Sequence, residues 1–474
     1  MKLQDIFFLA LLLFSLRLIR IRRIRHYFIL ICSAICVFKF QPVLAIRGLD
    51  FSLPIWTILL TICVYGAFSK QNPLKSKTNL IDAVILLISI FLIAATRFTE
   101  YDSILTASRP PQPSFIIPHL LTGAVLAFFL NSAAQKENKW QLSISIFFII
   151  AILVILKTPQ LTLIFSKAAR SVNGQSTDLA LNTDIRWFGF SYIAFRLLSI
   201  LIDSIKGRKT NIGLGEFFIY VCFPPALSAG PIDRWDRFTK EYSSDTKSDI
   251  FDDLYSGLGQ IALGLFHKFI LADALSKLAL SSQNAGLFLH KGWAWAALFA
   301  YALQIYFDFS GYSEIAIGLG ILFGIRLPKN FDHPYLKPDL TKFWSSWHIT
   351  LTQWVRSYVF NPLTRSLRGN KSHPLPQWLI ILTTQLTTML LIGLWHGVTI
   401  NFVIWGIWHG FGLFVHQLYS RKTGPWLRSM SAGFRKIYTV CSVLLTVFYV
   451  VLGWVWFVVP EFTDAVSFFG RLFG

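Results

Sequence analysis

Long apolar segments alternate with short polar ones along the chain. A helix that crosses a bilayer needs about 20 mostly apolar residues. In the first apolar stretch, Phe7–Leu16, the basic residues come after the apolar run rather than before it, and no small-residue cleavage site follows. A signal peptide has the opposite arrangement, so we predict a retained span or a shallow interfacial helix. The next candidate spans are Tyr27–Ile46, Phe51–Phe68, Leu80–Ala95, Phe115–Ser132, Leu142–Leu156, Trp187–Ile205 and Leu214–Ala229.

The regular rhythm changes after Gly230. Leu254–Ser276 is apolar but interrupted by charged residues, and Trp293–Ile325 is too long for one straight span. Leu379–Leu418 is long enough for two spans, and Ile437–Val459 closes the chain. We therefore predict an all-α polytopic membrane protein with about 11 to 13 spans, some of them re-entrant.

Composition supports a membrane protein. Hydrophobic residues make up 54% of the 474 residues and charged residues only 14%, whereas soluble domains carry roughly 25% charged residues. The mean hydropathy is +0.54. A soluble core cannot absorb this apolar excess, which excludes a secreted disulfide scaffold, a disordered chain and an ordinary cytosolic enzyme.

The net charge of +20 comes from 44 Lys and Arg against 24 Asp and Glu. Basic residues gather in alternate loops, while Arg47–Asp50 and Phe98–Ser114 are poorer in positive charge. This is the positive-inside pattern, and it places the N-terminus outside and the Arg17–Arg25 loop in the cytoplasm. Some basic residues are also candidates for contacts with anionic lipid headgroups or an acidic carrier. The residues that set this orientation are Arg17, Arg20, Arg22, Arg23, Arg25, Lys70, Lys75, Lys77, Glu100, Asp102, Lys136, Lys139, Lys206, Arg208 and Lys209.

The segment Asp339–Phe360 has the pattern of an amphipathic helix. Spacings of i, i+3, i+7 and i+10 place three tryptophans and a leucine on one face, and Asp339 or Thr341 can cap the start. We predict an interfacial helix that carries His348. The four apolar residues are Trp344, Trp347, Leu351 and Trp354.

Ionisable groups inside apolar segments are functional candidates, because each costs at least about 2.5 kcal/mol in hydrocarbon. His396 lies in Gly393-Leu-Trp-His-Gly397, whose glycines allow close helix packing or a local break that exposes the imidazole to a cavity. A neutral imidazole there can accept a proton from a hydroxyl. The alternative is a hydrogen-bonded core histidine. The other candidates are His409, Asp308, Glu314, Asp203 and Asp273.

His409 follows His396 by 13 positions. On one unbroken helix it lies on another face and roughly 20 Å away, so the two cannot act as a pair. His409 and His416 share a face, but two histidines without a third ligand make a weak metal site. We expect packing for His409 and no metal. For His348 the alternative is an interfacial side chain that reaches water, and for Asp308 a hydrogen bond between helices.

No motif of a serine hydrolase, a Walker-type ATPase, a zinc protease or a dinucleotide-binding enzyme occurs. Instead, ordered blocks over roughly residues 185–415 make the chain resemble the membrane-bound O-acyltransferase family, in the branch of the alginate O-acetylation and teichoic acid D-alanyl transfer proteins. The blocks are Phe190–Phe195 leading to Asp203, Phe223–Arg234, Tyr306–Gly320, Pro328–Phe331, Phe343–Trp354 and Gly393–Gly397.

The resemblance implies that His396 is the family's catalytic histidine and that His348 is the second histidine of this branch. It implies a ring of helices around a central tunnel, in which an acyl donor from the cytoplasm meets an extracytoplasmic acceptor. Residues expected to line or support this tunnel are Trp344, Trp347, Trp395, Asp308, Ser310 and Asn401. Asp308 is expected to be structural rather than catalytic.

We expect an acyl thioester, acetyl-CoA or an acyl carrier protein, as co-substrate, and no tightly bound cofactor. The acceptor is expected to be a glycan hydroxyl or a periplasmic acyltransferase partner, and the location the bacterial inner membrane. We predict N-terminal transmembrane helices over residues 1–135, the catalytic core over 136–418, and a basic loop with the last span over 419–474. A transporter or flippase of a lipid-linked or acylated intermediate is the competing hypothesis, and an export scaffold the third.

Overall fold

The computed structural model describes residues 3–19, 21–69, 76–100, 104–135, 139–208, 212–243, 249–288, 290–369 and 374–474. Within these ranges every regular element is a helix. The α-helices are α1 (Leu3–Leu18), α2 (Arg22–Lys39), α3 (Leu49–Phe68), α4 (Lys77–Ala95), α5 (Ile116–Gln135), α6 (Lys139–Lys157), α7 (Pro159–Val172), α8 (Phe190–Ile205), α9 (Leu214–Val221), α10 (Trp235–Ser243), α11 (Ile250–Leu265), α12 (Asp273–Ser276), α13 (Lys291–Phe323), α14 (Leu340–Ser346), α15 (Ile349–Val355), α16 (Asn361–Gly369), α17 (Gln377–His396), α18 (Ile400–Ser429), α19 (Ala432–Val458) and α20 (Phe462–Phe473).

Seven of the described segments are long and apolar enough to cross a membrane. The chain is therefore an all-α polytopic membrane protein, as predicted. The larger total of about 11 to 13 spans stays a prediction. The seven segments are Leu49–Ala67, Lys77–Phe98, Pro113–Leu130, Lys139–Lys157, Ile250–Ser276, Gln377–His396 and Ala432–Val458. Of the charges used for the predicted orientation, Arg20, Lys70, Lys75, Asp102, Lys136 and Lys209 lie outside the described residues.

Two predicted segments differ in the structure. Leu214–Ala229 does not form one span, because α9 has 8 residues and is followed by a short 3₁₀ turn over Pro224–Ala226. Proline lacks the amide hydrogen that continues a helix. In contrast, Trp293–Ile325 is helical without a break as far as Phe323, where α13, of 33 residues, ends.

Contacts along the backbone divide the chain into two compact units. Unit 1 comprises residues 1–260 and 316–327, and unit 2 comprises residues 261–315 and 328–474. The predicted catalytic and tunnel residues all lie in unit 2, whereas the further candidate Asp203 lies in unit 1. The predicted functional division at residues 135 and 418 follows different boundaries and stays a prediction.

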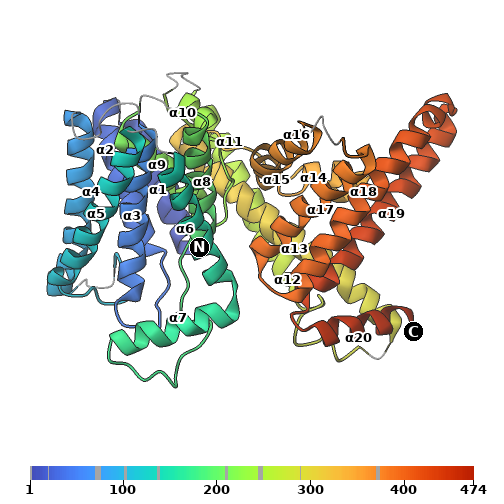
Figure 1. The fold of residues 1–474 in the computed structure, drawn as a ribbon, viewed down its shortest axis with the longest axis horizontal. Coiled ribbons are helices and arrows are strands. Elements are labelled where there is room, and N and C mark those ends of the chain that lie inside the picture. Colours follow the sequence, from blue (N-terminus) through green and yellow to red (C-terminus); the bar gives the residue numbers. More distant parts are fainter. Residues whose placement is uncertain are drawn as a thin grey trace. The chain divides into compact units, whose positions relative to one another are not determined.

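In unit 1, α7 runs across the direction of its neighbours (Figure 1). Its buried polar face meets Asp184, whose carboxylate accepts hydrogen bonds from Ser166 Oγ at 2.7 Å and Arg170 Nε at 2.9 Å. Burial by itself raises the pKa of this carboxyl, but the bonds from Arg170, Ser166 and the Leu181 amide outweigh it, so the pKa lies below its usual value. The cluster ties α7 to the loop before α8.

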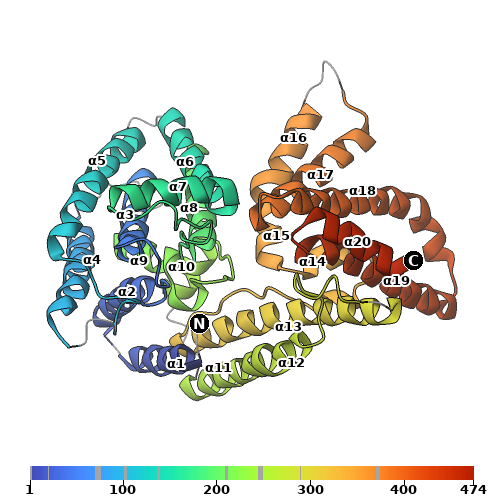
Figure 2. The same cartoon turned by 90° about the horizontal axis from the view of Figure 1, so that it is seen from below.

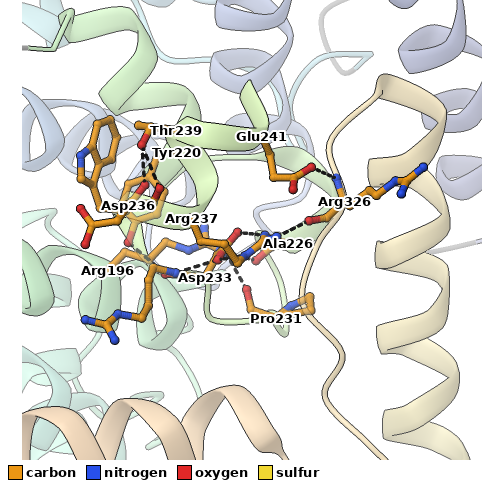
Figure 3. A network of polar contacts seen from close by, with 12 residues as sticks. Arg196, Tyr220, Ala226, Pro231, Asp233, Asp236, Arg237, Thr239, Glu241 and Arg326 are labelled. Carbon is orange, nitrogen blue, oxygen red and sulfur yellow. Dashed lines mark hydrogen bonds and ion pairs between the residues drawn. The ribbon is translucent and has the colours of Figure 1, made fainter. Parts of the chain in front are cut away.

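A second polar cluster in unit 1 holds the loop after α9 (Figure 3). The guanidinium of Arg196 is buried and donates to the carbonyl oxygens of Val221 at 2.6 Å, Ala226 at 2.8 Å and Pro231 at 3.3 Å. Buried carbonyl groups need such partners, because an unpaired one costs about as much as a lost hydrogen bond. Arg196 therefore fixes a loop whose regular structure, in the described residues, is one short 3₁₀ turn.

In unit 2, α17 and α18 pack along each other, α18 packs on α19, and α14 lies against α18 (Figure 2). Close approach depends on glycine: a Cβ added at Gly406 would lie 2.8 Å from the Cα of Leu390. Small residues at helix interfaces allow this contact in membranes. Figure 1 shows α16 and the connection between α18 and α19 at the upper end of unit 2, and α20 at its lower end.

Candidate functional site

His396 is the last residue of α17, and the chain turns back through Gly397 into α18. A Cβ at Gly393 would collide with the carbonyl oxygen of Phe402, so the two helices meet closely at the turn. The local break that the glycines allow is confirmed. The long apolar segment is a helical hairpin that presents His396 at its bend.

His348 lies at a second break. The single amphipathic helix predicted over Asp339–Phe360 is wrong, because α14 ends at Ser346 and His348 adopts the left-handed conformation with φ 44°. This conformation costs an L-residue roughly 1–2 kcal/mol and interrupts a right-handed helix. The predicted cap is correct: the carboxylate of Asp339 accepts a hydrogen bond of 2.8 Å from the Lys342 amide.

The segment is buried rather than interfacial. Trp344 is 7% exposed, Trp347 5% and His348 3%, which contradicts both the interfacial helix and a histidine that reaches water. Trp354, the fourth member of the predicted face, instead lies with its ring 5.0 Å from that of Tyr358.

Asn330 holds the turn at His348. Its backbone carbonyl accepts the Ile349 amide at 2.8 Å, and its side-chain oxygen accepts the Thr350 hydroxyl at 2.6 Å. The His348 ring then stands edge-on to Phe309, with centroids 4.7 Å apart. These contacts fix the strained backbone and the ring together.

Both predicted catalytic histidines line one cavity of about 70 Å³. At about 30 Å³ for each water, this volume has room for about two water molecules. It therefore fits a small acyl group but not a whole sugar ring. The lining residues are Ile305, Phe309, Trp344, Trp347, His348, Leu351, Thr352, Ile392, His396, Trp405, Trp454 and Phe457.

The cavity has aromatic and aliphatic walls with few polar groups. The His396 ring lies 4.8 Å from Phe457 and 4.5 Å from Trp395. Burial lowers the pKa of His348, which sits between α14 and α15 outside the candidate spans. Its imidazole is therefore neutral at pH 7, with one nitrogen able to accept a proton.

The predicted supporting residues fall into two groups. Trp344 and Trp347 line the cavity, and the ring of Trp395 lies 6.1 Å from that of His348 without forming part of the lining. Asn401 is not among the lining residues. Its amide donates to the carbonyl oxygens of Val459 at 2.7 Å and Pro460 at 3.1 Å. It joins the start of α18 to the end of α19.

Asp308 and Ser310, on α13, also lie outside the cavity lining. Asp308 forms an ion pair with Lys268, and Ser310 is buried. Six residues after Asp308 on α13, Glu314 pairs with His267 at 2.7 Å. Within the described ranges, no group of three His, Cys, Asp or Glu side chains could hold a metal ion.

Sequence reasoning missed part of the cavity. Ile392 lies one turn before His396, a spacing that could have identified it. Trp405 lies one turn before His409, which was singled out for other reasons. Trp454 and Phe457 lie in the last span, where no local signal indicates contact with a block more than 50 residues earlier.

Sequence comparisons identify the family of the chain. Residues 126–458 match the sequence profile of MBOAT, the membrane-bound O-acyltransferase family. A teichoic acid D-alanyltransferase of Streptococcus thermophilus is 32% identical over 302 residues, which cover 61% of this chain and 67% of the relative. A probable alginate O-acetylase AlgI of Pseudomonas fluorescens is 33% identical over 289 residues, 60% of this chain and 54% of the relative.

A peptidoglycan O-acetyltransferase of Helicobacter pylori is 32% identical over 253 residues, which cover 53% of this chain and 45% of the relative. The chain thus spans about half the length of the two acetylating relatives. The matched profile covers most of the chain and includes both histidines of the cavity. The protein belongs to the membrane-bound O-acyltransferase family.

Proposed function

We propose that the protein is an O-acyltransferase that moves an acyl group, acetyl in the first instance, from a cytoplasmic thioester donor to a hydroxyl of an extracytoplasmic glycan or relay protein. The observation that carries the proposal is the shared cavity of His348 and His396. The names of the three relatives, a D-alanyltransferase and two O-acetylating enzymes, support acyl transfer.

His396 acts as the general base in the proposed reaction. It takes the proton of the acceptor hydroxyl as the oxygen attacks the thioester carbonyl. The new ester C–O bond forms, the C–S bond breaks, and the proton passes from His396 to the leaving thiolate. Neutral His348 donates a hydrogen bond to the carbonyl oxygen as negative charge develops there.

The cavity would position the two reactants and exclude water. Holding a thioester and a hydroxyl in contact removes much of the entropic barrier of a bimolecular reaction. The aromatic walls also exclude bulk water, which would otherwise hydrolyse the donor. A volume of about 70 Å³ favours a short acyl group such as acetyl over a fatty acyl chain.

The charge of unit 2 supports an anionic donor. Between Asp339 and Glu461 the sequence has no Asp or Glu, and it has Lys or Arg in α16 and around the connection of α18 with α19. Both lie at the upper end of unit 2 in Figure 1. By the positive-inside rule we assign this end to the cytoplasm, where coenzyme A or an acyl carrier protein would arrive. The bilayer would be the inner membrane of a bacterium.

The test measures alkali-releasable acyl ester on envelope and secreted glycans. A deletion strain would be complemented with the wild type, His396→Ala or His416→Gln at matched membrane levels. His416 is the control, because it lies on α18 outside the cavity lining. We expect the wild type and His416→Gln to restore the ester and His396→Ala to lower it about 10²- to 10⁴-fold.

Full ester in the His396→Ala strain would overturn the proposal. That result would favour the competing transporter, which moves an acylated intermediate without chemistry and has no need of a base. The released acid, identified by mass spectrometry, would name the acyl group.

A further inference from the structure

His409 has no role in the proposed reaction, yet its environment is unusual. The side chain is fully buried on α18, at 0% exposure. Among the described residues, neither of its ring nitrogens has a hydrogen-bond partner. Most buried polar groups are paired, and an unpaired one in a native structure requires an explanation.

The rings around His409 form the back of the catalytic cavity. Its imidazole lies 4.9 Å from Trp344, 4.8 Å from Trp405 and 6.3 Å from Trp454, measured between ring centroids. All three tryptophans line the cavity of His348 and His396. Since Trp405 is also 6.0 Å from His396, a single indole separates the two histidines.

The break between α17 and α18 makes this possible. On one continuous helix His396 and His409 would lie far apart, but the turn at Gly397 folds the two helices together. Gly453 on α19 leaves space for the imidazole, because a Cβ there would lie 2.5 Å from its Nε2 atom. Three elements of unit 2 thus place His409 directly behind the wall.

The tryptophans of the wall also have unused donors. The indole N–H groups of Trp344 and Trp405 are buried and, within the described part of the chain, without hydrogen-bond partners. Two N–H donors and the imidazole of His409 therefore lie on one side of a cavity that is too small for a sugar ring. A neutral imidazole supplies one further donor and one acceptor.

We propose that His409 is a third histidine of the site, which binds a hydroxyl or ring oxygen of the acceptor when the wall formed by Trp344 and Trp405 shifts. This inference rests on the proposed function. A hydroxyl both donates and accepts, as a neutral imidazole does, whereas a short acyl chain needs no polar partner. The existing volume fits the acyl group of the donor but not a sugar ring, so we assign the new space to the acceptor rather than to the acyl group.

The test uses the full chain in nanodiscs, with acetyl-CoA as the donor and alkali-treated glycan from the deletion strain as the acceptor. Thiol release reports turnover, with and without glycan. We expect His409→Leu to lower kcat/KM for the glycan at least about tenfold, with the KM for acetyl-CoA and the glycan-free thiol release unchanged. His409→Gln keeps one donor and one acceptor, so it should recover part of the loss.

Stability provides a readout that does not depend on turnover. Replacing an unpaired buried group by an apolar one of similar size is neutral or stabilising, so His409→Leu should melt at or above the wild-type temperature. Glycan should raise the melting temperature of the wild type and not that of His409→Leu. His119→Leu is the matched control, because the ring nitrogens of His119 contact Ser52 Oγ and the Phe115 carbonyl. This variant should melt at a lower temperature than the wild type, and glycan should still raise its melting temperature.

Wild-type kinetics and glycan stabilisation in His409→Leu would overturn the inference and make His409 a packing residue. If that variant does not fold, His409→Met decides, because it also lacks the imidazole donor and acceptor, and wild-type kinetics for the glycan in it would be equally contrary. The proposed function fails separately, when His396→Ala transfers acetyl as fast as the wild type.

Discussion

The side-chain oxygen of Asn330 accepts a hydrogen bond of 2.6 Å from the hydroxyl of Thr350, two residues after His348. The Asn330 amide also donates to Ser313 Oγ at 3.2 Å. Asn330 is 1% exposed and lies 18 positions before His348. A buried amide that touches no cavity atom therefore determines where one of the two catalytic candidates stands.

The first prediction removes this support. Asn330→Ala leaves the Thr350 hydroxyl and amide without their acceptor, so we expect a loss of about 1–3 kcal/mol in the free energy of unfolding. The turn would also release the His348 ring, and transfer should fall about 10²-fold, the loss typical of a misplaced group. Thermal unfolding in detergent and ester formation measure the two effects.

Thr350→Val is the comparison variant, since it removes one hydrogen bond and keeps the shape of the side chain. Its losses should be smaller, because the Asn330 oxygen still accepts the Thr350 amide at 3.3 Å. Normal activity in Asn330→Ala would show that His348 does not depend on this contact.

A second prediction separates the backbone of His348 from its ring. Its φ of 44° suits glycine and strains alanine. We expect the free energy of unfolding of His348→Gly to be about 1 kcal/mol higher than that of His348→Ala. Both variants should lose transfer activity, because both lack the imidazole.

His333 provides the matched control, with a φ of 45° and an exposed side chain. The same pair of substitutions there should show the same stability difference and full activity. Retained transfer in His348→Gly would remove His348 from the chemistry, whatever its stability.

The sequence identified the two histidines but not the way they meet. Their meeting depends on the bend at Gly397 and on the left-handed residue at His348, and both bends arise from tertiary contacts. Helical spacing placed Trp344, Trp347 and Leu351 on one face, and all three do line the cavity. The error was to continue the helix through His348, where the hydrogen bonds of Asn330 outweigh local helix propensity.

The rest of the cavity could not be predicted from local patterns. Trp454 and Phe457 come from the last span, and an apolar span looks the same in sequence whether it faces lipid or a site. For Asp308 the local pattern singled out the residue but not its partner. A carboxylate in an apolar segment is a functional candidate, but its partner Lys268 lies 40 residues earlier, and only the packing of the two segments shows the pair.

The third prediction concerns this pair. Asp308→Asn and Lys268→Gln each leave one charge without its partner, so each should lower the free energy of unfolding by about 0.2–1 kcal/mol, the range of half-exposed ion pairs. The double variant should cost less than the sum of the two, because no lone charge remains. Asp308 lies outside the cavity lining, so kcat per folded molecule should not change.

A double-mutant cycle on thermal unfolding measures the coupling, with ester formation normalised to folded protein. Reduced kcat in Asp308→Asn at full stability would return Asp308 to the reaction. Additive losses would mean that the two side chains do not pair in the membrane.

The last prediction tests the Asp184 cluster of unit 1. Its pKa is lowered in the folded protein, so the contribution to stability is present above the unfolded value, about 3.9, and is lost as the pH falls through the folded value. Asp184→Asn leaves the buried guanidinium of Arg170 without its charge partner, at a cost of about 3–5 kcal/mol at pH 7. The difference from the wild type should shrink as the pH falls below about 4, because the unfolded wild-type chain then takes up a proton at Asp184 before the folded protein does.

The double variant Arg170→Met with Asp184→Leu is the control, because apolar residues that replace both members of a buried pair often restore stability. Melting temperatures from pH 7 to pH 3 would show the effect. A constant gap between wild type and Asp184→Asn over that range would mean that the carboxylate is not the group that titrates. Transfer per folded molecule should be unchanged in both variants, since α7 contributes no residue to the cavity.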